Sequence, residues 1–336
     1  MVSEEMKVIR SDHIDYSLAD EIMAESGGEH LYACSSCGTC AATCLIRRFN
    51  PAFNPRALIL KATLGLRDEV LSGAEIWECS ACDQCYPRCP HGIHISDVMK
   101  AIRIVAIRHG YERPTVTATV RVQTCVACGR CVKACPYEAI ALQEVKLGRT
   151  TKQAAQVDRI LCAGCGICNA VCPSSSIGVE DHSDKRLHES LLASASALAE
   201  LSKGGLQGKL LAIVCNWCLH STLDAAAAAN PPDGVDVLRV PCTGRVSTLA
   251  IMTALRLGID GVLVVGCKDK ECHYLKGNNL GSSRVGLANE FLGMLGVPKQ
   301  RLKFVQVGML DRGRFPRLLK EALAQVRELE SISVSG

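Results

Sequence analysis

The sequence predicts a multidomain protein with a helical first part, a small α+β second part and an α/β third part built on a parallel sheet. The chain has 336 residues, and this length favours more than one domain, because a single domain usually holds about 100–200 residues. Four cysteine runs of one spacing occupy the first half of the chain. The last third instead alternates short β-branched runs with helical stretches, which is the pattern of a parallel sheet covered by helices.

The four runs each contain three cysteines separated by two residues and a fourth cysteine three residues further on. This is the spacing with which cysteines hold [4Fe-4S] clusters. Zinc is the main alternative, but zinc sites usually take two close cysteines and two more at a distance, so the repeated runs favour four [4Fe-4S] clusters. The predicted ligands are Cys34, Cys37, Cys40 and Cys44 in the first run, Cys79, Cys82, Cys85 and Cys89 in the second, Cys125, Cys128, Cys131 and Cys135 in the third, and Cys162, Cys165, Cys168 and Cys172 in the fourth.

Other features of the sequence exclude competing classes of cysteine-rich protein. The N-terminus has no continuous apolar segment of the signal-peptide kind, and no apolar run approaches the ~20 residues that a membrane-spanning helix needs. We therefore expect a cytoplasmic protein without direct membrane insertion. A disulfide scaffold is disfavoured because such scaffolds are short secreted chains with an even number of cysteines, whereas this chain has 21.

The basic charge balance does not indicate a nucleic-acid partner. The formal net charge of +4 counts every cysteine as neutral. Five bound clusters, each carrying about −2 with its thiolates, would bring this sum to about −6. Only 4% of the residues are aromatic, which leaves few side chains for stacking on bases. The excess of lysine and arginine is therefore interpreted as compensation for cluster charge.

The first part, residues 1–114, is predicted to be helical. Segments 55–70 and 95–108 have apolar positions at helical spacing, and the second carries Val98, Ile102 and Val105 on one face. With its cysteine motifs, above all WECSACDQCYPRCP, this part resembles the C subunit of heterodisulfide reductases. The resemblance implies an α-helical ferredoxin fold with two clusters. The first run departs from the family pattern at Leu45, where proline usually follows the fourth cysteine.

The second part, residues 115–181, resembles a bacterial two-cluster ferredoxin, which is an α+β fold. Proline follows both Cys135 and Cys172, as in that family. In such ferredoxins the fourth cysteine of one run binds the cluster held by the first three cysteines of the other. The resemblance thus implies one cluster on Cys125, Cys128, Cys131 and Cys172, and a second on Cys162, Cys165, Cys168 and Cys135. By the same logic the first part would pair Cys34, Cys37 and Cys40 with Cys89, and Cys79, Cys82 and Cys85 with Cys44.

The third part, residues 209–336, is predicted to be an α/β domain that follows a helical linker at 182–208. Short apolar runs predict strands at 209–214, 235–240, 261–265 and 303–307, and helices are expected at 246–257 and 287–295. The segment 316–330 has helical periodicity and is expected to be a packing helix. Cys215, Cys242 and Cys267 each come at the end of a strand, where open α/β sheets carry their functional groups.

The cysteine motifs of the third part are IVCNWCLH, RVPCTGRVS and VVGCKDKECHYLKGN. They resemble the delta subunit of methyl-viologen-reducing hydrogenases, a family whose members carry one [2Fe-2S] cluster and link an electron donor to heterodisulfide reductase. One [2Fe-2S] cluster has four ligand positions, and five cysteines are candidates for them: Cys215, Cys218, Cys242, Cys267 and Cys272. Cys242, Cys267 and Cys272 are the first choices, and the choice between Cys215 and Cys218 stays open. Structural zinc in the same pocket is the alternative.

Several residues near the cysteines have two interpretations. His91, His94 and His273 could hydrogen-bond a cluster or ligate iron, but surface or loop positions are expected for them. Trp217 and Arg245 lie inside the cysteine loops of the third part. The arginine either offsets cluster charge or is a solvated side chain, and the sequence does not decide between the two.

No substrate site is recognisable, which favours an electron-transfer protein without catalysis of its own. The sequence has no Gly-x-Gly-x-x-Gly motif and no P-loop, so no binding site for a nucleotide cofactor is evident. By resemblance, the chain would relay single electrons from or to a donor dehydrogenase or hydrogenase subunit, with a flavin-containing heterodisulfide reductase A-like subunit of an electron-bifurcating complex on the other side. Two rival functions are a thiol/disulfide oxidoreductase that uses the surplus cysteine of the third part and a docking adaptor with structural zinc.

Overall fold

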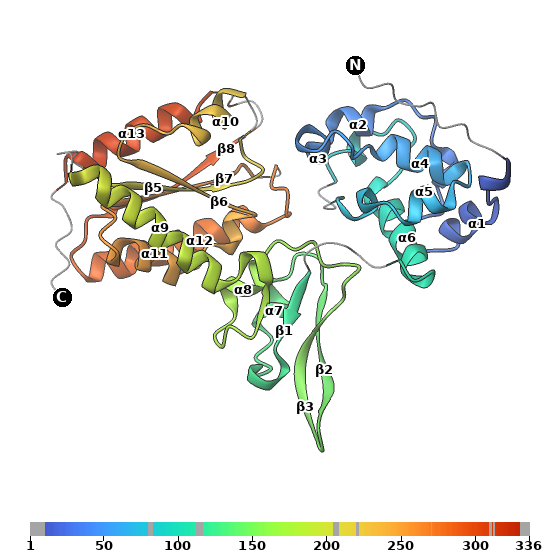
Figure 1. Cartoon of the computed structure of the whole chain (residues 1–336), viewed down its shortest axis with the longest axis horizontal. Coiled ribbons are helices and arrows are strands. Elements are labelled where there is room, and N and C mark those ends of the chain that lie inside the picture. Colours follow the sequence, from blue (N-terminus) through green and yellow to red (C-terminus); the bar gives the residue numbers. More distant parts are fainter. Residues whose placement is uncertain are drawn as a thin grey trace. The chain divides into compact units, whose positions relative to one another are not determined.

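The computed structural model describes residues 11–79, 83–111, 117–203, 208–219, 222–269, 271–308, 311 and 313–329 (Figure 1). The chain divides into two compact units, Met1–Thr115 and Val116–Gly336. Cys82 lies outside the described residues. No helix within the described ranges is both long and apolar enough to cross a bilayer.

The described residues of the first unit form only helices and loops. The helices are η1 (Ser11–His13), α1 (Ser17–Met23), η2 (Leu31–Ala33), α2 (Thr39–Thr43), α3 (Leu45–Phe49), α4 (Pro55–Thr63), α5 (Arg67–Leu71), η3 (Ala74–Trp77), η4 (Tyr86–Arg88) and α6 (Ile95–Arg108). Helix α6 has the bounds expected from the sequence, and its face with Val98, Ile102 and Val105 is fully buried. Burial of this apolar face is the main source of stability for such a helix.

The single helix expected over residues 55–70 is divided into α4 and α5. Helix α4 begins at Pro55, and the side chain of Asn54 caps it by accepting a hydrogen bond from Ala57 N at 3.3 Å. The division falls at Gly65, whose φ of +73° favours glycine. A side chain at this position would lie 2.4 Å from the carbonyl oxygen of Asp15. Periodicity predicted the helical residues but did not show this close approach of a distant segment.

The first half of the second unit is a small α+β structure. Strands β1 (Ala118–Val120) and β4 (Ile177–Val179) pair antiparallel, and β2 (Ile140–Leu147) and β3 (Thr150–Val157) form a long hairpin (Figure 1). The short helices η5 (Val122–Thr124), α7 (Arg130–Ala134) and α8 (Ile167–Val171) complete this part. Each of α7 and α8 begins directly after a glycine in the left-handed conformation. These turns position the cysteine runs beside the strands.

The second half of the second unit is a parallel sheet of strand order β6-β5-β7-β8. The strands are β5 (Leu210–Cys215), β6 (Val235–Val240), β7 (Gly261–Cys267) and β8 (Leu302–Val307). The prediction of a parallel sheet is confirmed, and the four expected strand positions agree with the observed ones to within two residues. A parallel sheet needs both faces covered, and helices lie on both sides of this one (Figure 1).

Helices α10 (Thr222–Ala229) and α13 (Phe315–Arg327) pack on one face of the sheet, and α9 (Asp184–Lys203), α11 (Thr248–Arg256) and α12 (Gly277–Met294) pack on the other. The short helices η6 (Glu180–His182), η7 (Thr243–Arg245) and η8 (Lys299–Arg301) lie in the connections. Helix α9 falls in the segment expected to be a linker, but it buries Leu191 and Leu198 against the sheet. Helix α12 begins ten residues before its expected start, directly after the last cysteine loop.

Candidate metal centres

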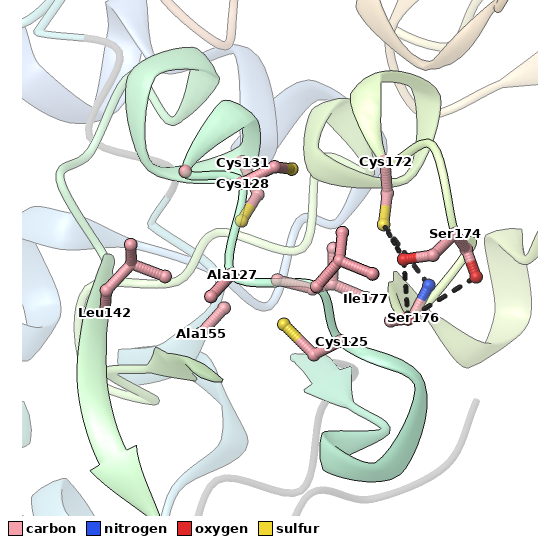
Figure 2. A pocket seen from close by; sticks show the side chains of 12 residues that line it. Cys125, Ala127, Cys128, Cys131, Leu142, Ala155, Cys172, Ser174, Ser176 and Ile177 are labelled. Carbon is pink, nitrogen blue, oxygen red and sulfur yellow. Dashed lines mark hydrogen bonds between the residues drawn. The ribbon is translucent and has the colours of Figure 1, made fainter. Parts of the chain in front are cut away.

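The first cysteine site of the α+β part is a pocket that holds Cys125, Cys128, Cys131 and Cys172 (Figure 2). Three of these cysteines come from the third run and its helix α7, and the fourth comes from the end of α8. The other walls are largely apolar and include Leu142, Ala155 and Ile177. The structure therefore brings together the same four cysteines that the ferredoxin resemblance implies as one ligand set.

The sulfur of Cys172 is surrounded by hydrogen-bond donors. Ser176 N donates to it at 3.2 Å, and the hydroxyl of Ser174 lies 3.6 Å away (Figure 2). Burial opposes ionisation of this thiol, but the hydrogen bonds from Ser174 and its neighbours outweigh burial and lower the pKa of Cys172. A metal ligand must be a thiolate, so this local environment suits ligation.

The second cysteine site of the α+β part holds Cys135, Cys162, Cys165 and Cys168 in one pocket. Ala118 N donates a hydrogen bond to the sulfur of Cys162 at 3.4 Å. Burial raises the pKa of Cys165 to about 12, and the nearby sulfurs of Cys162 and Cys135 add to this effect. Such a buried set of thiols needs a positive metal core to become ionised.

In the first unit several cysteines of the two runs lie close enough to influence one another, while their crossed pairing stays a prediction. Burial and then the nearby thiols of Cys34, Cys37 and Cys89 raise the pKa of Cys40, and Cys79 contributes in the same way to the raised pKa of Cys44. His91 at its exposed position bonds Ser35 at 2.7 Å, which joins the segments of the first and second runs. The structure also leaves Cys85 partly buried in the loop that precedes η4.

Arg103 supports the loop that carries the second run. It is 8% exposed, and its guanidinium group donates to Ile76 O at 2.7 Å and to Cys79 O at 2.5 Å. These bonds fix the backbone at the first cysteine of the run. No sequence signal points to this role, because an arginine in the middle of an amphipathic helix is ordinarily a solvated residue.

The third candidate centre lies at the carboxyl edge of the parallel sheet. Cys215 and Cys267 end neighbouring strands, and their sulfurs lie 3.8 Å apart. Cys242 follows β6, and Cys272 lies in the loop that leads to α12. These four cysteines are buried, as expected for residues that converge from separate strands.

Backbone N–H groups point at three of these four sulfurs. Trp217 N donates to Cys215 at 3.5 Å, Gly244 N donates to Cys242 at 3.4 Å, and Asn278 N donates to Cys272 at 3.4 Å. Hydrogen bonds of this kind stabilise thiolates and tune the potential of a cluster. Hydrogen bonds from Cys242 and Cys267 lower the pKa of Cys272, which favours its thiolate form.

Cys218 differs from the other four cysteines of this part. Its thiol donates to two backbone carbonyl oxygens, Cys215 O at 3.2 Å and Val265 O at 3.5 Å. It is completely buried in the core that the sheet forms with α13. Because its thiol is buried and bonded to carbonyl groups, this cysteine has the environment of a core residue.

Trp217, His273 and Tyr274 form an aromatic cluster beside the third centre, where Trp217 and Tyr274 pack with Cys242. The rings of Trp217 and His273 stack at 3.7 Å, and both contact Tyr274 edge-on. Burial lowers the pKa of His273 to about 3, so its ring is neutral. His273 lies in the turn before α12, so the expected loop position holds, but its side chain is 1% exposed and not at the surface, whereas His91 is exposed.

The donor sets fit iron–sulfur clusters. Each of the three centres of the second unit combines four cysteine sulfurs with apolar walls and backbone N–H groups, and thiolates are the ligands such clusters take. Within the described ranges no three side chains of cysteine, histidine or acidic residues converge as they would around one metal ion. Which cysteine binds which cluster stays a prediction.

Comparison with known families assigns the three parts of the chain. Residues 210–330 match the methyl-viologen-reducing hydrogenase, delta subunit, and residues 33–94 and 124–176 each match a 4Fe-4S dicluster domain. These matches support [4Fe-4S] clusters as cofactors. They also confirm the families inferred from the cysteine motifs.

Individual relatives each match about a third of the chain. The chain is 35% identical over 122 residues to the iron-sulfur D subunit of the F420-non-reducing hydrogenase of Archaeoglobus profundus, a match that covers 36% of this chain and 89% of the relative. It is 37% identical over 114 residues to the C subunit of the H(2):CoB-CoM heterodisulfide,ferredoxin reductase of Methanothermobacter thermautotrophicus, a match that covers 34% of this chain. The same match spans 60% of the length of that relative.

A third relative is the A subunit of a heterodisulfide reductase. In Methanosarcina acetivorans, the A subunit of the ferredoxin/F(420)H(2)-dependent CoB-CoM heterodisulfide reductase is 33% identical over 129 residues, which cover 38% of this chain and 16% of the relative. The relatives are thus subunits of heterodisulfide reductases and hydrogenases, and they support iron–sulfur electron transfer. The chain belongs to the family of the methyl-viologen-reducing hydrogenase delta subunit, and it joins that domain to two 4Fe-4S dicluster domains.

Proposed function

We propose that this protein is a fused electron relay that carries four [4Fe-4S] clusters and one [2Fe-2S] cluster. The observation that carries the proposal is the arrangement of the second unit, which brings three sets of four cysteines together in one compact body. Iron–sulfur clusters exchange single electrons, and the protein contributes their spacing, insulation and potentials. The chain needs no substrate site for this role.

For the [2Fe-2S] cluster we propose Cys215, Cys242, Cys267 and Cys272 as ligands. Cys215 is preferred over Cys218 because its sulfur lies 3.8 Å from that of Cys267, whereas the Cys218 thiol is engaged with two carbonyl groups. The [4Fe-4S] clusters take the crossed sets implied by the ferredoxin resemblance. In the second unit those sets line separate pockets, which supports the assignment.

The order of transfer within the second unit follows from its packing. The [2Fe-2S] site borders the pocket of Cys135, Cys162, Cys165 and Cys168, because Cys165 and Cys242 lie in one buried apolar cluster with Ile167 and Tyr274. We propose that electrons pass between these two sites and then through the site of Cys172. A dry, packed contact between neighbouring centres favours direct exchange over side reactions with solvent.

The proposed partners come from the relatives. A hydrogenase or formate dehydrogenase type of donor would meet the delta-subunit-like domain, and a flavin-containing heterodisulfide reductase A-like subunit of a bifurcating complex would exchange electrons with the relay. The matches to subunits of hydrogenase and of heterodisulfide reductase support this assembly. We also propose that the protein is cytoplasmic. We further propose that its first 208 residues comprise two domains and a linker.

A thiol/disulfide oxidoreductase is the weaker candidate. A redox thiol needs a lowered pKa and exposure. The surplus cysteine, Cys218, is instead completely buried, and its thiol donates hydrogen bonds to carbonyl groups. Its environment therefore gives no support to thiol chemistry on a substrate.

The test is the content of iron, acid-labile sulfide and zinc per chain in anaerobically purified protein, with EPR spectra of the reduced sample. The relay predicts about 18 iron and about 18 sulfide, with no zinc. About 16 iron with one zinc would make the third part a docking adaptor. Much less iron with several zinc ions would refute electron transfer as the function.

A further inference from the structure

The two cysteine sites that border each other in the second unit share a boundary built from a few residues, which we call the seam: Gly166, Ile167, Gly244, Arg245 and Gly277. On the ferredoxin side, Gly166 and Ile167 lie between the predicted ligands Cys165 and Cys168. On the other side, Gly244 and Arg245 follow Cys242, and Gly277 begins α12. Every residue of the seam is thus next to a predicted cluster ligand in sequence or in space.

Apolar contact across the seam is close. A β-carbon added to Gly244 would lie 2.9 Å from Cγ1 of Ile167, and one added to Gly277 would lie 3.6 Å from Cδ1 of the same side chain. The β-carbon at Gly277 would also lie 2.1 Å from the sulfur of Cys242. Ile167, which precedes Cys168, therefore packs against the backbone that holds the third centre.

Arg245 adds a buried positive charge to the seam. The side chain is 1% exposed, and its stem covers Gly166, where an added β-carbon would lie 2.8 Å from Cδ of the arginine. Its Nε donates to His182 O at 2.6 Å, and its Nη2 donates to Asp184 Oδ1 at 2.7 Å. The buried Nη1 has no acceptor among the described residues. Of the two roles that the sequence left open for Arg245, burial excludes the solvated one.

A second guanidinium group lies on the other side of the same loop. Nη1 of Arg284 donates to Gly244 O and, at 3.4 Å, to Val246 O, while its Nη2 is buried without an acceptor in the described part of the chain. Burial lowers the pKa of Arg284 to about 10, the nearby Arg245 adds to this, and the sulfur of Cys242 opposes it. The group is therefore still charged at neutral pH.

The two buried donors without acceptors suit a neighbouring anion. A buried donor without an acceptor destabilises the fold, and a charged donor does so more strongly. Asp184 is bonded to Arg245 but is itself 43% exposed at its side chain, so it compensates the buried charge incompletely. The two proposed clusters with their thiolates, at about −2 each, would supply negative charge on both sides of the seam.

We propose that Arg245, supported by Arg284, places positive charge between the two centres and raises the reduction potential of both. One-electron reduction adds one negative charge to a cluster, and a nearby cation in a dry seam stabilises that reduced form. The electron passes from one centre to the other, and no bond is formed or broken. Arg245 thus acts through its charge on the reduction potentials of the two clusters. The inference rests on the proposed function, since it requires both clusters.

The test compares midpoint potentials, measured by EPR-monitored redox titration, in the whole protein and four variants. Arg245→Met removes the charge and keeps much of the stem. We expect the equilibrium constant for one-electron reduction to fall at least tenfold at one or both centres, which corresponds to about 59 mV. Arg245→Lys keeps the charge and restores most of the loss. The control is Arg256→Gln, an exposed arginine at the far end of α11, which leaves both potentials unchanged.

The direction in which Asp184→Asn changes the midpoint potentials is the decisive result. It removes the carboxylate that partly neutralises Arg245, so we expect the potentials to rise, opposite to the effect of Arg245→Met. A merely structural role of the ion pair would move both variants in the same direction or leave both potentials unchanged, and either result would overturn the proposal. Asp184 is partly exposed, so this variant still decides the question if Arg245→Met does not fold.

Iron and sulfide content separates this inference from the proposed function. Wild-type protein that lacks iron in the third part would refute the relay, and the inference with it. Wild-type protein and Asp184→Asn with full iron content but equal potentials would refute the role of Arg245 alone.

Discussion

The packing of α12 against the third centre gives a sharp test through one glycine. Gly277 is the first residue of α12, and a β-carbon added there would lie 2.1 Å from the sulfur of Cys242. Real β-carbons do not approach other heavy atoms within 3.0 Å, so in Gly277→Ala the sulfur or the helix must move by about 1 Å. Cys242 is 1% exposed and has little room to move.

The expected difference in stability between two alanine variants follows from two effects, overpacking at one position and helix propensity at the other. Overpacking of a close-packed site costs about 1–3 kcal/mol. Gly286→Ala in the same helix is the matched control, because no heavy atom lies within 4 Å of the added β-carbon. Alanine is favoured over glycine in a helix by about 1 kcal/mol, so the control is expected to gain stability. The two variants should therefore differ by about 2–4 kcal/mol in the free energy of unfolding of the α/β part.

The assay combines urea unfolding, followed by circular dichroism, with iron analysis of both variants. The difference corresponds to an unfolding midpoint lower by roughly 1 M urea or more in Gly277→Ala. We also expect that variant to lose about two iron atoms per chain, because a displaced sulfur no longer fits a [2Fe-2S] centre. If Gly277→Ala kept its iron and unfolded at the same urea concentration as Gly286→Ala, the packing of α12 on Cys242 would be refuted.

Three further predictions concern single side chains. Cys215→Ser should lose about two iron per chain, whereas Cys218→Ser should keep all its iron because a hydroxyl can still donate to the same carbonyl groups; equal losses would contradict the ligand choice. Ile167→Ala should cost about 2–5 kcal/mol of stability and Ile167→Val about 0.5–1.5, measured by urea unfolding, and equal midpoints would show that the side chain is not packed across the seam. Ser174→Ala should lower the potential of the cluster at Cys172 in a redox titration without loss of iron, because one donor to that sulfur is removed.

The strands and the ligand groups could be predicted because their signals are local or repeated. The central strands β5 and β7 are short apolar runs, and burial on both faces makes these runs continuous. The spacing of the cysteine runs follows from the shape of the cluster that they hold, and the crossed sets of the ferredoxin part meet in separate pockets. The resemblance to known families supplied the crossing, which spacing alone does not imply.

The choice between Cys215 and Cys218 could not be made from the sequence. The two cysteines are three residues apart, at a point where β5 ends and the chain turns. Which of them points at Cys267 depends on the direction in which each side chain leaves the turn, and only the three-dimensional pairing of β5 with β7 sets this direction. The burial of the His273 loop side chain could not be predicted for the same reason, because its stacking partner, Trp217, is distant in sequence.

The glycines of the seam allow the two neighbouring cysteine sites to pack closely. Gly244 and Gly277 have no side chains, and this lets Ile167 approach the loop of Cys242. Gly281, one turn after Gly277 in α12, likewise lies against Thr243, where an added β-carbon would meet Cβ at 2.9 Å. Larger residues at these positions would push the ferredoxin part and α12 away from Cys242, and the gap would admit water beside the sulfurs. The glycines therefore serve the contact between the two centres, and Arg245 can carry its charge there because the same contact excludes solvent.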